Sequence, residues 1–198
     1  MAEIYVEKAY YENGNVEMEI PFKDNIVHGI VKYYDENGNL ESEMPYNIGE
    51  LHGIARSYYK NGNLKMEIPF KNNKKQGMSK GYYENGKLQY EMPYKKDMLQ
   101  GIAKGYYKNG NLKAKTPCKD DKAQGIARFY NKNGDMIMKV LYKDDEIQSI
   151  TCTNGKQFTS EQLARIQHAN NHIDEAIQIY NELWWNRYWN FIYKFNQL

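Results

Sequence analysis

The dipeptide Asn-Gly recurs with a fixed spacing of 24 residues, and this period constrains the fold more than any other feature of the chain. The copies lie at 13–14, 37–38, 61–62, 85–86, 109–110 and 133–134. A second glycine, a tyrosine and a proline keep the same period, as at Gly53, Tyr58 and Pro69. Self-similarity at a fixed period is typical of repeat proteins, so the sequence predicts six copies of one structural unit.

Asn-Gly between two runs of apolar and aromatic residues predicts a β-hairpin with a two-residue type I′ turn. In such a turn both central residues have φ > 0, which Asn and Gly tolerate well. A turn at Asn61-Gly62 places Ser57 opposite Met66 and Tyr58 opposite Lys65. The glycines expected to hold these turns are Gly14, Gly38, Gly62, Gly86, Gly110 and Gly134.

The two faces of each hairpin differ because side chains alternate along a strand. One face is expected to be apolar throughout, with Tyr59 opposite Leu64 as one of its pairs. The other face is expected to carry ion pairs between strands, namely Lys8–Glu19, Lys32–Glu43, Arg56–Glu67 and Lys80–Glu91. Six hairpins in series therefore predict a mainly β protein, an elongated single-layer antiparallel β-meander about 60 Å long.

After Gly155 the spacing of apolar residues changes from two to about 3.6, which is typical of a helix. Residues 159–162, Thr-Ser-Glu-Gln, have the form of a capping box. The pair Asn170-Asn171 is expected to separate two helices, at about 160–169 and 172–195.

This change of pattern divides the chain into a repeat array over residues 1–156 and a C-terminal helical segment over residues 157–198. The helical segment also holds all three tryptophans, Trp184, Trp185 and Trp189. It is expected to cap the sheet, because a solenoid needs its last repeat covered. The alternative is an element for dimerisation or for docking of a partner.

Charge is unevenly distributed although the net charge is only +2. Residues 1–55 hold 3 basic and 11 acidic residues, net −8, whereas residues 56–143 hold 20 basic and 7 acidic residues, net +13. In the last two repeats the glutamates of the ion-pair face give way to lysine. The predicted anion-facing patch comprises Lys104, Lys113, Lys115, Arg128 and Lys139. Sequence drift in a tolerant solenoid is the alternative, and nucleic acid is not expected, because the acidic end would repel it.

One tyrosine per repeat forms a second candidate surface, made of Tyr34, Tyr58, Tyr82, Tyr106 and Tyr130. Cross-strand packing of these rings would stiffen the sheet. A recognition surface is the other interpretation, because tyrosine is enriched at protein interfaces. The repetition alone favours neither.

No constellation of residues indicates catalysis. His28 and His52 occupy the same position one repeat apart, so roughly 10 Å separates them, too far to share a metal ion. No glycine-rich phosphate loop and no Ser-His-Asp or Cys-His spacing is present. We therefore expect no enzyme activity, no cofactor and no metal, and we expect no disulfide between Cys118 and Cys152.

No run of 18 apolar residues indicates a membrane span. Residues 1–12, MAEIYVEKAYYE, lack the basic and apolar regions of a signal peptide. A cytoplasmic protein is therefore expected, or a secreted or periplasmic one if a leader has been removed.

The block HGIARSYYKNGNLKMEIPF, residues 52–70, resembles the MORN repeat in the bacterial variant found in YwqK-type antitoxins of toxin–antitoxin systems. The matching positions are His52-Gly53, Tyr58-Tyr59, Asn61-Gly62 and Leu64, and the resemblance extends over roughly residues 5–152. It implies a scaffold without enzyme activity that binds proteins, with a toxin as one expected partner.

Two functions of different classes thus remain open at this stage. The first is a protein-binding scaffold, which includes an antitoxin or immunity protein and a homo-oligomer formed through the sheet face or the C-terminal helix. The second is a peripheral module that binds anionic lipid or another anionic surface.

Overall fold

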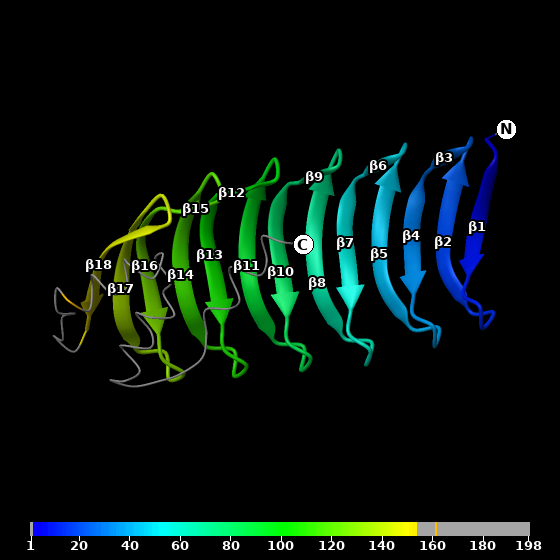
Figure 1. Cartoon of the computed structure of the whole chain (residues 1–198). Coiled ribbons are helices and arrows are strands. Elements are labelled where there is room, and N and C mark those ends of the chain that lie inside the picture. Colours follow the sequence, from blue (N-terminus) through cyan, green and yellow to red (C-terminus); the bar gives the residue numbers. More distant parts are fainter. Residues whose placement is uncertain (1, 154–160, 162–198) are drawn as a thin grey trace.

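The computed structural model describes residues 2–153 and 161, and its strands form one antiparallel sheet in which neighbours in sequence lie side by side (Figure 1). The strands that precede the Asn-Gly turns are β1 (Ile4–Tyr10), β4 (Gly29–Tyr34), β7 (Gly53–Tyr58), β10 (Gly77–Tyr82), β13 (Gly101–Tyr106) and β16 (Gly125–Tyr130). The strands that follow these turns are β2 (Val16–Lys23), β5 (Leu40–Asn47), β8 (Leu64–Lys71), β11 (Leu88–Lys95), β14 (Leu112–Lys119) and β17 (Met136–Lys143). The short segments β3 (Ile26–Val27), β6 (Glu50–Leu51), β9 (Lys74–Lys75), β12 (Met98–Leu99) and β15 (Lys122–Ala123) each lead into the next long strand, and β18 (Glu146–Cys152) pairs with β17.

This arrangement confirms the predicted antiparallel meander of repeating hairpins. The curved strands follow one another in chain order from β1 at one end to β18 at the other (Figure 1). The helices expected at about 160–169 and 172–195, and with them the C-terminal cap, lie outside the described residues apart from Glu161.

The Asn-Gly turns are not of type I′. At one of them the Gly62 N–H donates to the Tyr59 carbonyl at 2.8 Å, and the Tyr59 N–H donates to the Asn63 carbonyl at 2.8 Å. Gly62 has φ 81°, but Asn61 is not among the residues with positive φ. This geometry is a type I turn followed by a left-handed glycine. The prediction of a type I′ turn was therefore wrong, although the glycine of the pair does lie in the left-handed region.

Two-residue turns with positive φ at both positions lie at the strand ends opposite the Asn-Gly turns, where they connect one repeat to the next. Asn72 and Asn73, with φ 51° and 63°, join β8 to β9. The Asn73 N–H donates to the Leu51 carbonyl at 3.0 Å, and the Leu51 N–H donates to Asn73 Oδ1 at 2.8 Å. Each such turn is therefore tied to the repeat before it.

The constant spacing of proline and glycine from repeat to repeat follows from one close contact. The Pro69 carbonyl accepts from the Gln76 N–H at 2.9 Å, so the Pro69 nitrogen faces the interruption between β9 and β10. A residue without an N–H therefore removes no ladder hydrogen bond there. A Cβ at Gly77, where φ is 121°, would lie 3.0 Å from Pro69 Cγ. Glycine is required at this position for both space and backbone conformation.

A one-residue bulge shifts the register of each hairpin near its turn. Ser57 pairs with Met66 as predicted, but Tyr58 pairs with Leu64, which leaves Lys65 as the extra residue. The predicted pairs Tyr58–Lys65 and Tyr59–Leu64 were therefore wrong. The Lys65 ammonium instead lies 5.9 Å from the centroid of the Tyr59 ring.

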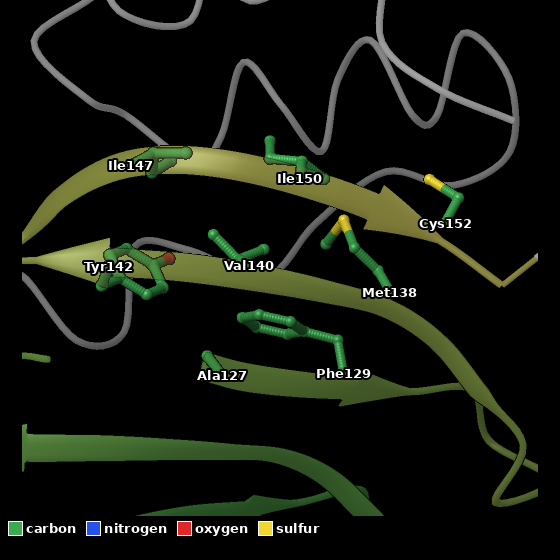
Figure 2. Packing of buried hydrophobic residues seen from close by; sticks show 8 residues of the cluster. All are labelled: Ala127, Phe129, Met138, Val140, Tyr142, Ile147, Ile150 and Cys152. Carbon is green, nitrogen blue, oxygen red and sulfur yellow. The ribbon is translucent and has the colours of Figure 1, made fainter. Parts of the chain in front are cut away.

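The most buried part of the described sheet lies on the face predicted to be apolar, at the C-terminal end. It comprises Ala127, Phe129, Met138, Val140, Tyr142, Ile147, Ile150 and Cys152 from β16, β17 and β18 (Figure 2). Nearer the N-terminus single residues such as Val31 are buried. Tyr90 is buried directly over Gly81, where any Cβ would collide with its ring.

Candidate binding face

The opposite face of the sheet carries a row of charged residues, one from each long strand between β1 and β17. Glu19, for example, pairs with Lys8 in its own hairpin and with Lys32 in the next. We call this set the charge row, and in order across the sheet it comprises Lys8, Glu19, Lys32, Glu43, Arg56, Glu67, Lys80, Glu91, Lys104, Lys115, Arg128 and Lys139. Its sign alternates as far as Lys104, after which the next three members are all cations.

Only part of the predicted ion pairing forms within the charge row. Three ion pairs form among these residues, namely Lys8–Glu19 at 2.8 Å, Arg56–Glu67 at 3.2 Å and Lys104–Glu91 at 3.1 Å. Two predicted pairs, Lys32–Glu43 and Lys80–Glu91, are aligned in register without forming an ion pair. The structure shows that Glu91 pairs across the boundary between repeats.

The candidate tyrosines, Tyr34, Tyr58, Tyr82, Tyr106 and Tyr130, make a contact that the sequence did not reveal. Four of the five hydroxyls donate to a glutamate of the preceding repeat at 2.8–3.0 Å, in the pairs Tyr34–Glu19, Tyr58–Glu43, Tyr82–Glu67 and Tyr106–Glu91. Burial, together with the hydrogen bond to its glutamate, raises the pKa of Tyr58 to about 12. Four of the five candidate tyrosines therefore join neighbouring hairpins. The fifth, Tyr130, has Lys115 at the position that corresponds to these glutamates.

A second set of tyrosines joins the repeats in the other direction. Their hydroxyls donate at 2.7 Å to backbone carbonyls of the next repeat, in the pairs Tyr11–Tyr34, Tyr59–Tyr82, Tyr83–Tyr106 and Tyr107–Tyr130. Sequence reasoning missed this role, although a Tyr-Tyr pair at the repeat period was a signal for it.

Hydrogen bonding also stabilises the ionised form of the glutamates. Hydrogen bonds from Lys8 and Tyr34 lower the pKa of Glu19. Partial burial acts to raise the pKa of Glu91, but the hydrogen bonds from Tyr106 and Lys104 outweigh it and the net shift is downward. These carboxylates are therefore acceptors already bound within the chain, rather than acids placed for catalysis.

Beside the charge row runs a line of exposed apolar side chains, which we call the apolar row. It comprises Val6, Ile30, Ile54, Met78, Ile102, Ile126 and Leu141, each between 39% and 52% exposed. Each lies two residues along its strand from a member of the charge row, as Ile54 does from Arg56, and therefore on the same face. Sequence reasoning did not single out this surface, although all of its residues except Leu141 keep the repeat period. We call the face that carries both rows the charged face.

The structure brings together four of the five residues in the predicted cationic patch. Lys104 pairs with Lys115, which pairs with Arg128, which pairs with Lys139. Like charges directly opposite one another destabilise a sheet. The charged face therefore carries an unfavourable arrangement in its last two repeats.

Lys113 does not belong to this group. Because of the bulge, Leu112 and not Lys113 pairs with Tyr106, and the Lys113 ammonium lies 6.0 Å from the centroid of the Tyr107 ring. Burial lowers the pKa of Lys113 to about 7. The patch predicted from the sequence is thus reduced to Lys104, Lys115, Arg128 and Lys139.

The described residues offer little for metal binding or nucleophilic chemistry. Residues 2–153 and 161 contain no group of three or more His, Cys, Asp or Glu side chains placed to hold a metal ion. The Nδ1 atom of His52 instead lies 3.2 Å from Oδ1 of Asn72. Cys118 and Cys152 are both free thiols, and burial raises the pKa of Cys118 to about 11, which disfavours the reactive thiolate. The part of the chain that the structure describes contains no helix long and apolar enough to span a membrane.

Comparison with known proteins agrees with the repeat geometry. Six stretches match the sequence model of the MORN repeat variant, at residues 6–24, 27–47, 51–72, 75–96, 99–120 and 123–144. Together they cover more than half of the chain, and the match gives no assignment to a toxin–antitoxin family. No curated protein matches the chain. The chain belongs to the MORN repeat variant family, whose members are repeat scaffolds and generally not catalysts.

Proposed function

We propose that this chain binds a partner protein along its charged face. The observation that carries the proposal is the apolar row, in which seven apolar side chains are 39% to 52% exposed on one face. A periodic line of exposed apolar residues beside charged ones is typical of a protein interaction surface. Strand spacing places its members about 10 Å apart from one repeat to the next, with Leu141 directly opposite Ile126, so the row suits an elongated partner surface.

The contacts between repeats support the same proposal. The hydroxyls of Tyr58 and Tyr59 bind the preceding and the following repeat, at 2.8 Å and 2.7 Å. Such paired contacts hold neighbouring hairpins in fixed relative positions. A surface that is already ordered loses little conformational entropy on binding, which favours affinity.

The test is affinity capture with variants of the apolar row. The variant Ile54→Ser with Ile102→Ser removes two members of the row. The matched control, Ile26→Ser with Ile48→Ser, removes two exposed isoleucines that are not members of it. We expect a captured protein that the parent and the control retain, and that the row variant retains about tenfold less, as for interface anchors worth more than about 1 kcal/mol. Capture that is equal for all three proteins would contradict the proposal.

A toxin is a narrower form of this proposal. Its support is the resemblance of block 52–70 to repeats of bacterial antitoxins. Co-expression with the captured protein tests it, because an antitoxin should relieve growth arrest by that protein and the row variant should not.

Binding to an anionic surface is a second candidate function, and one observation favours it. Lys104, Lys115, Arg128 and Lys139 stand in succession on the charged face. Basic clusters are attracted to anionic lipid. Sedimentation with phosphatidylserine vesicles tests this candidate, which requires that binding fall when Arg128 and Lys139 are both replaced by glutamine.

A further inference from the structure

Each glutamate of the charge row lies in the same local environment. Glu91 pairs with Lys80 on one side and with Lys104 on the other. Its Oε2 accepts a hydrogen bond from the Tyr106 hydroxyl at 2.8 Å and one from the Lys104 ammonium at 3.1 Å. Two flanking cations and one tyrosine hydroxyl thus surround a carboxylate. The preceding repeats contain the same arrangement around Glu19, Glu43 and Glu67.

The next repeat keeps this environment but replaces the carboxylate. Lys115 occupies the position that corresponds to Glu91, while Lys104 and Arg128 flank it and Tyr130 takes the place of Tyr106. No carboxylate of the described chain forms an ion pair with Lys115 or Arg128, and none accepts a hydrogen bond from Tyr130. The groups that bind a carboxylate in four earlier repeats are therefore present here without one.

We propose that this position is a docking slot for carboxylates of an acidic segment in a partner protein. The carboxylate slot comprises Lys104, Lys115, Arg128, Lys139 and Tyr130. The inference rests on the proposed function, protein binding along the charged face, and names the chemistry of the partner. A carboxylate of the partner replaces the missing internal one and separates cations that otherwise oppose one another.

The surroundings of the slot favour a protein segment over a lipid or a nucleotide. The four cations lie in a single line across four strands, a span of about 14 Å at the spacing of β-strands. Ile102, Ile126 and Leu141 of the apolar row are 40% to 51% exposed and lie one line further along the same face. An elongated segment that carries both carboxylates and aliphatic side chains can contact both lines together.

A labelled peptide tests the slot directly. The probe is a fluorescein-labelled twelve-residue peptide in which Glu-Glu-Leu-Leu is repeated, and its counterpart has Gln in place of Glu. Fluorescence anisotropy with the full chain at low salt should show about tenfold tighter binding of the Glu peptide, because charge-assisted hydrogen bonds are about twice as strong as neutral ones. Equal affinity for the two peptides would overturn the proposal.

Two charge-reversal variants separate the slot from general attraction. Lys115→Glu supplies the missing carboxylate from within, so we expect the Glu peptide to bind about tenfold more weakly. Lys71→Glu makes the same change of charge at an exposed residue outside the charge row, and should weaken binding no more than about threefold. Equal losses in both variants would overturn the proposal. If melting shows that Lys115→Glu does not fold, Arg128→Gln replaces it with the same expectation.

Two further measurements distinguish other occupants. Vesicles of phosphatidylserine that bind in a manner dependent on Lys115, in the absence of peptide binding, would assign the slot to lipid and overturn the proposal. A dimer of the parent that Lys115→Glu dissociates would assign it to a second copy of this chain and likewise overturn it. Capture that depends on the apolar row but not on Lys115 would leave the proposed function intact and reject the slot alone.

Discussion

The hydroxyl of Tyr106 and the ammonium of Lys104 bind the same carboxylate oxygen, Glu91 Oε2, at 2.8 Å and 3.1 Å. Glu91 lies on β11 and its two donors on β13, so the contact crosses the boundary between neighbouring hairpins. Only Tyr90–Gly105 and Glu91–Lys104 pair across that boundary in the strand ladder. Because a solenoid is held together by contacts between neighbouring repeats, this carboxylate is expected to matter for stability.

We therefore expect Glu91→Gln to destabilise the fold. Its side chain is 17% exposed, and hydrogen bonds to a charged group contribute about 1.5–3 kcal/mol each, so a loss of about 1–3 kcal/mol is expected on urea unfolding. The matched control is Glu12→Gln, at an exposed residue, which should change stability by less than about 0.5 kcal/mol. Similar losses for the two variants would show that the contact contributes little.

Acid should destabilise the fold by protonating the carboxylates of Glu19 and Glu91. Their pKa values lie below the usual value of about 4.3 because the charged form is hydrogen bonded in the folded state. A lowered folded-state pKa means that the stabilisation is complete above the unfolded pKa and is lost as pH falls through the folded pKa. Stability measured between pH 6 and pH 2 should therefore fall below about pH 4.3. The decrease should be shallower when Glu19 and Glu91 are both replaced by glutamine.

Two glycines at equivalent positions of different repeats should respond oppositely to alanine. Gly81 pairs with Tyr90, whose ring would collide with any Cβ at that position. Gly105 pairs with Ala114 and has nothing within 4 Å of such a Cβ. Gly81→Ala should therefore destabilise the array by about 1–3 kcal/mol, a typical loss from overpacking. Gly105→Ala should be neutral or stabilising by up to about 1 kcal/mol.

Thermal melts of the two variants make the comparison internal, because each serves as the control for the other. A lower midpoint for Gly105→Ala than for Gly81→Ala would mean that Tyr90 does not cover Gly81 in solution.

Valine at the turn glycines tests backbone conformation without packing. Gly62 has φ 81° and Gly86 has φ 78°, and a Cβ at either would have nothing within 4 Å. Gly62→Val should therefore destabilise by the cost of a left-handed β-branched residue alone, at least about 1–2 kcal/mol. Asparagine tolerates this conformation better than valine does, so Gly62→Asn should lose less stability than Gly62→Val in the same urea titration. Equal stability of parent, valine and asparagine proteins would contradict the assigned turn.

The repeat period and the alternation of side chains were sufficient to predict the hairpins and most of their register. Arg56 lies opposite Glu67 and Ser57 opposite Met66, as expected. The turn type was wrong because Asn-Gly fits two geometries, a type I′ turn and a type I turn with a left-handed glycine. The type I′ turn has a two-residue loop and the other a three-residue loop, and the pattern of residue types does not distinguish them. A bulge at Lys65 then moved that residue away from Tyr58.

The candidate site was predicted in part, for a related reason. The cations of the last repeats share one row, so strand pairing alone brings Lys104, Lys115, Arg128 and Lys139 together. The partner of each tyrosine was not predictable, because it lies 15 residues earlier in a different hairpin. That proximity depends on the register between neighbouring hairpins, which is set by the turns that connect one repeat to the next. The sequence analysis predicted no type for these connecting turns.

Restoring alternation in the charge row should stabilise the array and weaken partner binding together. Lys115→Glu with Lys139→Glu places a carboxylate beside Lys104 and Arg128 and gives the Tyr130 hydroxyl an acceptor, as in earlier repeats. Each favourable cross-strand pair that replaces a repulsive one contributes about 0.2–1 kcal/mol, so a rise in Tm of several degrees is expected. Partner affinity should fall, most strongly at low salt, because screening already weakens the attraction at high salt. The control, Lys23→Glu with Lys95→Glu, makes the same change of charge on exposed residues outside the row, which lie opposite Ile26 and Met98, and should not raise Tm. A stabilised protein that binds its partner as tightly as the parent at low salt would show that the cations serve no binding role.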